Sequence, residues 1–65
     1  MNNRIEIDHT VYPKRLRALS EPSLRYIIKD AREAMLAMPD GPKAGYYADE
    51  IHYASMELAR RRRKN

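Results

Sequence analysis

The chain has 65 residues and a mass of 7.7 kDa, which is enough for one small domain and too little for a classical enzyme fold. It contains no cysteine, so disulfide bonds and thiolate metal sites are excluded. A mean hydropathy of -0.82 leaves no apolar run near the roughly 20 residues that a membrane span requires. Residues 1–4 lack the apolar stretch of a secretory signal, and we therefore expect a cytoplasmic protein with no membrane partner.

The net charge of +4 comes from the C-terminal end of the chain, where residues 60–65 contain five basic residues and no acidic one. Residues 13–20 hold a second basic cluster. Adjacent like charges repel one another unless something neutralises them, so both clusters are candidates for contact with phosphate or with an acidic protein surface. The candidate nucleic-acid-binding residues are Lys14, Arg15, Arg17, Arg60, Arg61, Arg62, Arg63 and Lys64.

Residues 1–12 are predicted to form an extended N-terminal arm. Apolar and polar residues alternate along residues 4–11, as in a half-buried strand. A single strand has no partner in this chain, so the arm lies on the helices, pairs with a second copy or stays disordered. Residues 13–19 begin with a proline, which suits the first turn of a helix, and we expect a short helix there with Leu16 and Leu19 facing inward.

The first long helix is expected to begin after Ser20, a favourable N-cap, because Glu21 and Pro22 both suit a first helical turn. Apolar residues then recur at steps of three and four and predict one buried stripe of Leu24, Ile27, Ile28, Ala31, Met35 and Met38. Two prolines and a glycine within residues 38–42 predict the end of this helix and a turn.

A second long helix is expected over residues 42–62, where no breaker interrupts the pattern. Its predicted inner stripe is rich in small residues and consists of Ala44, Tyr47, Ala48, Ile51, Ala54, Ser55 and Leu58. Gly45 is unfavourable inside a helix, so we expect either the close approach of another backbone there or fraying of the helix end.

These elements predict an all-α fold, an antiparallel αα-hairpin over residues 13–59 with a short N-terminal helical turn. The extended arm of residues 1–12 precedes it, and residues 60–65 form a basic helix end or tail. A hairpin of this size buries only one side of each helix and is marginal alone. Dimerisation as a four-helix bundle would cover the remaining apolar surface.

A spare helical face that carries tyrosines is the best candidate for binding another protein. Tyrosine is favoured at interfaces because its apolar ring carries a polar tip. Tyr46 and Tyr53 lie seven residues apart, which puts them on one side of the second helix. The candidate protein-binding residues are Tyr26, Tyr46, Glu50, Tyr53 and Met56.

No residues of the chain suggest catalysis or a cofactor. Asp49 and His52 share a helical face, but a metal site needs more ligands, and the other histidine, His9, lies in the arm. We favour a hydrogen-bonded surface or interface histidine over a metal ligand, and we expect a protein that is not an enzyme. Part of the basic C-terminal cluster has a structural explanation, since Glu57 is spaced to pair with Arg60 or Arg61.

Residues 24–31 (LRYIIKDA) and 42–53 (PKAGYYADEIHY) resemble small uncharacterised helical proteins encoded by tailed bacteriophages. The likeness covers about the C-terminal two thirds of the chain, brings no catalytic motif and names no target. It implies expression inside a bacterial host and a part in host takeover, defence evasion or accessory work on the particle.

Three functions follow from these patterns. The leading one is a non-enzymatic protein that binds and modulates a host or phage protein through its tyrosine-bearing face. The second is a nucleic-acid-binding accessory protein without sequence preference, which uses the basic clusters. The third is a structural homo-oligomer whose tyrosine face is its own interface.

Overall fold

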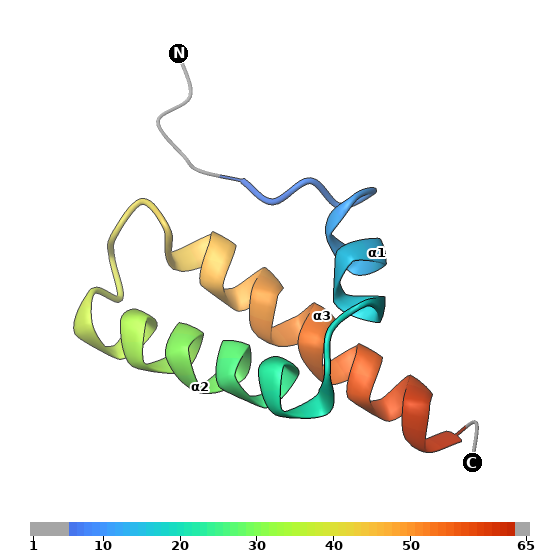
Figure 1. Ribbon diagram of the computed structural model, residues 1–65. Coiled ribbons are helices and arrows are strands. Elements are labelled where there is room, and N and C mark those ends of the chain that lie inside the picture. The colour runs from blue at the N-terminus through green and yellow to red at the C-terminus, as the bar shows by residue number, and fades with distance from the viewer. Residues whose placement is uncertain (1–5, 64–65) are drawn as a thin grey trace.

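The computed structural model describes residues 6–63, so residues 1–5 and 64–65 lie outside the described range. Three helices occur there, α1 (Tyr12–Arg17), α2 (Glu21–Ala37) and α3 (Ala44–Arg63), and none of residues 6–63 forms a strand (Figure 1). The all-α class predicted from the sequence is confirmed for this part of the chain. None of these helices is both long and apolar enough to pass through a bilayer.

The N-terminal segment does not form the strand that its alternating pattern predicts. Residues 6–8 have no regular secondary structure, and residues 9–11 form a turn. Asp8 stabilises this turn because its Oδ1 accepts hydrogen bonds from the backbone N–H groups of Thr10 (2.9 Å) and Val11 (3.1 Å). The bond from Val11, and then that from Thr10, lowers the pKa of Asp8 below its ordinary value.

α1 begins one residue earlier and ends two residues earlier than the sequence predicts. The backbone N–H of Tyr12 donates to the carbonyl of Asp8 at 2.9 Å, which carries the turn directly into the helix. Pro13 lies in the first turn, as expected. Of the two leucines predicted to face inward, Leu16 is buried and Leu19 is half-buried.

α2 begins where the sequence predicts it. The Ser20 hydroxyl accepts a hydrogen bond from the backbone N–H of Ser23 at 3.3 Å, which is the expected N-cap. The helix ends at Ala37, because Met38 precedes a proline and is therefore disfavoured in the α region.

α3 begins two residues later than predicted, because the chain first makes two tight turns. The N–H of Gly41 donates to the carbonyl of Met38 at 3.1 Å, and the N–H of Ala44 donates to the carbonyl of Gly41 at 3.1 Å. The chain thereby reverses direction, and α2 and α3 lie side by side (Figure 1). α1 packs against α3.

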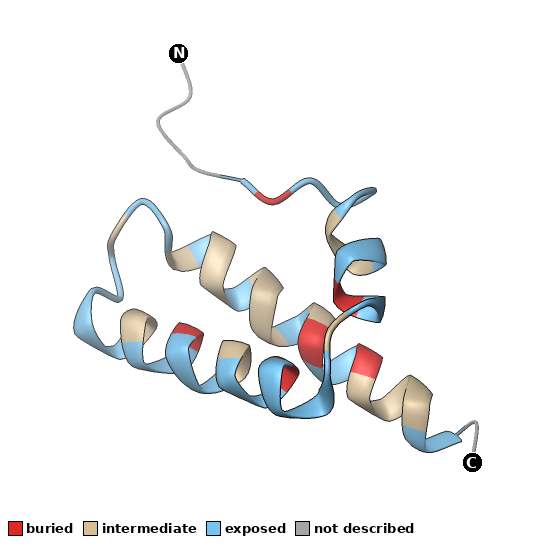
Figure 2. Ribbon diagram, viewed as in Figure 1, coloured by how far each residue is buried: buried red, intermediate tan, exposed pale blue. Residues whose placement is uncertain are grey.

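The core is small and lies where the three helices meet. Its buried members are Leu16 from α1, Leu24 from α2 and Ala54 from α3 (Figure 2). Partly buried apolar side chains surround them: Tyr12, Leu19, Ile27, Ile28, Tyr53 and Leu58. The described helices thus share one apolar centre, and large parts of α2 stay exposed (Figure 2).

Three predictions about buried residues are wrong, those for Met38, Ala48 and Ser55. Met38 is 63% exposed because the helix ends before it, and its side chain does not continue the α2 stripe. Ala48 and Ser55 are exposed because the inner side of α3 is divided between α2 and α1. Gly45 is exposed, and a Cβ built there would meet nothing within 4 Å, so within the described chain no backbone approaches it closely, and approach by another chain and fraying of the helix end stay predictions.

Candidate functional site

The contact between α1 and the C-terminal half of α3 is organised by one buried carboxylate. Glu57 is only 6% exposed. Its Oε2 accepts hydrogen bonds from Arg60 Nη2 and from Arg61 Nε, both at 2.8 Å, and its Oε1 accepts one from Arg60 Nε at 3.0 Å. The hydrogen bonds from Arg60, aided by those from Arg61 and opposed by burial, lower the pKa of Glu57 to about 2. The carboxylate is therefore ionised and paired at neutral pH.

Arg61 also joins the two helices. Its Nη2 donates to the backbone carbonyls of Leu16 (3.2 Å), Arg17 (3.3 Å) and Leu19 (2.6 Å). These carbonyls lie at the end of α1, where a helix leaves acceptors without intrahelical partners. Arg61 was a candidate phosphate-binding residue, but its guanidinium is already engaged by Glu57 and by the α1 terminus.

A depression of about 210 Å³ lies beside this junction, and we call it the Tyr53 depression. It is lined by Pro13, Arg17, Tyr53, Met56, Glu57, Arg60 and Arg63. Two candidate protein-binding residues and three candidate nucleic-acid-binding residues therefore meet in one place. Met56 is 54% exposed, so its apolar side chain is accessible at the surface.

Tyr53 is held by residues from the N-terminal segment and α1. A hydrogen bond of 2.7 Å joins its hydroxyl to His9 Nδ1, and its ring centroid lies 6.1 Å from that of Tyr12 at an interplanar angle of 54°. Ile7 is buried. Residues 6–11 therefore lie on the helices, one of the three arrangements left open by the sequence, and they fix the orientation of Tyr53.

Glu50 was predicted to contact a partner, but it bonds within the molecule. Its Oε2 accepts a hydrogen bond from the Tyr12 hydroxyl at 3.0 Å. Burial raises the pKa of the Glu50 carboxyl, with the Tyr12 hydrogen bond acting in the opposite direction. Burial and this neighbouring carboxylate also raise the pKa of the Tyr12 hydroxyl. Neither Tyr12 nor His9 was singled out from the sequence as a partner of α3.

The other two candidate tyrosines lie away from the Tyr53 depression. Tyr26 belongs to α2 and is 67% exposed. The Tyr46 ring packs edge-on against Tyr47 with centroids 6.1 Å apart, and the Lys43 ammonium lies 5.9 Å from its centroid. Of the five candidate protein-binding residues, Tyr26 lies on another helix, Tyr46, Glu50 and Tyr53 follow one another at steps of four and three along α3, and Met56 lines the depression with Tyr53.

The basic residues are brought closer together by the packing of α1 on α3. Arg17 and Arg63 line the same depression, and Lys14 and Arg15 are exposed on α1. Arg62 is exposed on α3, and Lys64 lies outside the described residues. Among residues 6–63, neither Arg17 nor Arg63 forms an ion pair with a carboxylate.

Asp49 and His52 have separate neighbours. Asp49 Oδ2 lies 3.9 Å from His9 Nε2, and both side chains are exposed, whereas the His52 ring packs against Tyr53 with centroids 5.5 Å apart. Within the described part of the chain, no three histidine or carboxylate side chains are grouped so that they could hold a metal ion.

Comparison of the chain with protein-family models, with curated proteins and with solved structures finds no match. The function is therefore argued from the residues of the Tyr53 depression.

Proposed function

We propose that this chain is a small non-enzymatic protein that binds another protein through the Tyr53 depression. The observation that carries the proposal is the combination of an exposed Met56 and a fixed Tyr53 ring with guanidinium groups at the rim. Tyrosine, methionine and arginine are the residue types enriched at the centres of protein interfaces. A partner surface that offers an apolar side chain flanked by carboxylates fits this arrangement.

Arg17 and Arg63 supply the charge that such a partner would meet. Their guanidinium groups have no carboxylate partner among residues 6–63, whereas Arg60 is already paired with Glu57. Arginine binds carboxylates through two parallel hydrogen bonds, which adds orientation to the attraction. We therefore expect the affinity to depend more on Arg17 and Arg63 than on Arg60.

The partner's source is proposed from the sequence alone. The likeness of residues 24–31 and 42–53 to small phage-encoded proteins supports a partner from the bacterial host or the phage, met in the host cytoplasm. Binding at the Tyr53 depression would then modulate that partner by occupying one of its surfaces.

Capture from a nuclease-treated bacterial lysate tests this proposal, with retained proteins identified by mass spectrometry. Met56→Glu places a charge in the depression without disturbing the core, because Met56 is exposed. We expect one protein to be retained in stoichiometric amount by the native chain and about 10-fold or more weakly by Met56→Glu and by Arg63→Glu. Met38→Glu is the matched control, since Met38 is also exposed but lies near the turn before α3.

Tyr53→Ala is a poor first variant, because Tyr53 packs against the core and bonds to His9. A loss of binding there would not separate a contact from a folding defect. Equal retention of the captured protein by the native chain, Met56→Glu and Arg63→Glu would refute the proposal.

Binding of nucleic acid without sequence preference is the second candidate. It is supported by the packing of α1 on α3, which brings Arg17 to the same depression as Arg63 and leaves Arg62 exposed nearby along α3. Several phosphate contacts would make the affinity for single-stranded DNA fall steeply with salt. The double variant R62E/R63E should lower the salt slope by about 1 for each phosphate that the chain no longer neutralises. A slope that stays the same would rule out this candidate.

A further inference from the structure

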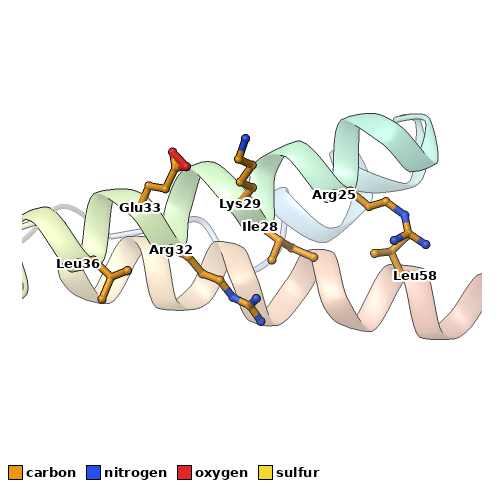
Figure 3. Close-up of a pocket in the computed structure, with 7 residues that line it drawn as sticks. All are labelled: Arg25, Ile28, Lys29, Arg32, Glu33, Leu36 and Leu58. Carbon is orange, nitrogen blue, oxygen red and sulfur yellow. The ribbon is translucent and has the colours of Figure 1, made fainter.

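A second hollow lies between α2 and α3, and we call it the α2 groove. It has a volume of about 360 Å³ and an apolar floor formed by Ile28, Leu36 and Leu58 (Figure 3). Leu36 is 83% exposed, the highest value among the exposed large apolar side chains of the described residues. No residue of α1 or of residues 6–11 lines this groove, so it is separate from the Tyr53 depression.

The lining of the α2 groove carries three cations, Arg25, Lys29 and Arg32, and one carboxylate, Glu33, so its net charge is positive. Arg25 and Arg32 extend from α2 towards α3, whereas Lys29 and Glu33 point away from α3 (Figure 3). Arg25 pairs with Glu21 at 3.2 Å on the exposed surface, and such pairs contribute little. Within residues 6–63, Lys29 and Arg32 form no ion pair.

The groove follows one stripe of α2 and has the length of a short helix. From Arg25 to Leu36 the helix axis covers about 16 Å, which is roughly three helical turns. We infer that the α2 groove binds an acidic amphipathic helix of another protein. Leucine-type side chains of that helix lie on Ile28 and Leu36, and its flanking carboxylates pair with Arg32 and Lys29.

Two other occupants of the α2 groove are a second copy of this chain and single-stranded nucleic acid, and the charge and composition of the groove argue against both. A two-fold contact with a second copy would bring the same surface of each molecule together, and the net positive lining would face itself. Single-stranded nucleic acid is bound through aromatic rings that stack on bases, and no aromatic residue lines this groove. An acidic helix satisfies both the apolar floor and the charged side chains of the lining.

A designed peptide tests this inference. The probe is a labelled helical peptide of about 14 residues, with leucines spaced three and four apart and glutamates on both flanks. A second peptide has lysine in place of each glutamate. Fluorescence anisotropy measures the affinity, and amide chemical shifts of the full chain map the site. We expect binding of the acidic peptide alone, with shifts concentrated on α2 and around Leu58.

Leu36→Glu and Arg32→Glu should each weaken binding of the acidic peptide by about 10-fold or more. Met38→Glu and Lys14→Glu are the matched controls, since they change exposed residues that line neither the groove nor the Tyr53 depression, and each should alter the affinity by less than about 2-fold. Met56→Glu is measured separately: a loss of peptide binding in Met56→Glu with none in Leu36→Glu would place the peptide in the Tyr53 depression and refute the inference about the α2 groove.

Four other results would also overturn the inference. These are equal binding of the lysine peptide, shifts confined to the Tyr53 depression, and displacement of the acidic peptide from α2 by single-stranded DNA. The fourth is a dimer in analytical ultracentrifugation that Leu36→Glu dissociates, because the groove would then be an interface between copies of this chain.

Discussion

Glu50 and Glu57 lie two turns apart on α3, yet their carboxyl groups have opposite surroundings. Glu57 is bonded by two guanidinium groups, and its pKa falls from the ordinary 4.5 to about 2. Glu50 is half-buried and bonded by a neutral hydroxyl, and burial raises its pKa. The same substitution at the two positions should therefore change stability in different ways.

Glu57→Gln should lower the free energy of unfolding at pH 7 by about 2 kcal/mol, because two guanidinium groups lose an ionised partner. A lowered pKa means that the folded state gains stability above the carboxyl's unfolded value and loses it as pH falls towards 2. The difference in free energy of unfolding between the native chain and Glu57→Gln should therefore shrink as the pH falls from 4.5 to 2. Urea titrations followed by circular dichroism at several pH values measure this. Glu21→Gln, in an exposed pair with Arg25, is the control and should cost only a few tenths of a kcal/mol.

Glu50→Gln provides the contrast. A raised pKa favours the protonated carboxyl, so the contribution of Glu50 to stability is present at low pH and is lost as pH rises through the folded-state value. A neutral amide avoids this loss and can still accept the hydrogen bond from Tyr12. At pH 7 the variant should be as stable as the native chain or more stable by a few tenths of a kcal/mol, since the group is partly solvated. If Glu50→Gln and Glu57→Gln lowered the free energy of unfolding equally, the surroundings described for the two carboxyl groups would be wrong.

The two carboxylates also show how far the sequence predicts individual contacts. A pairing of Glu57 with Arg60 or Arg61 was predicted from spacings of three and four residues on a helix, and both pairs form. The bonds from Tyr12 to Glu50 and from Arg61 to the α1 carbonyls join residues 38 or more apart in sequence. Such contacts depend on how α1 packs, and no local pattern encodes that packing.

At the scale of elements, the two glycines should respond differently to alanine. Gly45 lies exposed in the first turn of α3, and a Cβ there meets nothing within 4 Å. Gly45→Ala should therefore stabilise the protein by about 0.5 kcal/mol, because alanine loses less backbone entropy in a helix. Gly41 lies in the turn, where a Cβ would be 3.2 Å from the Met38 carbonyl oxygen. Gly41→Ala should therefore give no gain in stability. Thermal melts of the two variants measure the difference. A melting temperature of Gly45→Ala below that of the native chain would contradict the open space found beside Gly45 in α3.

Helix positions were better predicted than helix faces. The N-cap at Ser20 and the end of α2 before Pro39 depend on neighbouring residues, and both are found within one residue of the prediction. The inner face of α3 was treated as one stripe, but two elements pack against this helix on different sides. Ala48 and Ser55 therefore stay exposed, whereas Tyr53 and Glu57, assigned to other roles, become part of the junction with α1.

At the scale of the whole molecule, two surfaces of related chemistry lie on different pairs of helices, one on α1 and α3 and the other on α2 and α3. Each combines an exposed apolar side chain, Met56 or Leu36, with guanidinium groups that have no carboxylate partner among residues 6–63, such as those of Arg17 and Arg32. The Tyr53 depression exists only while α1 is docked on α3, whereas the α2 groove needs only α2 and α3. Loss of α1 docking should therefore affect the first surface more than the second.

Removal of the basic C-terminal end tests how the molecule is held together. Deletion of residues 60–65 takes both guanidinium groups from buried Glu57 and the donor from the α1 carbonyls. The deletion also uncovers Glu57 to water, so the loss comes from the charged hydrogen bonds of Arg60 and Arg61, about 1.5–3 kcal/mol each, against a total of about 3–10 kcal/mol for a domain of this size. We expect the truncated chain to lose most of its helical circular dichroism and its cooperative melt at 25 °C.

The matched variant R62E/R63E removes comparable positive charge from exposed positions and leaves Glu57 paired. It should keep the native helicity and melting temperature within a few degrees. Native helicity in the truncated chain would mean that Glu57 finds water or another cation, and that Arg61 does not hold α1 in place. Because deletion removes structural and surface arginines together, only R62E/R63E can test whether the basic end binds nucleic acid.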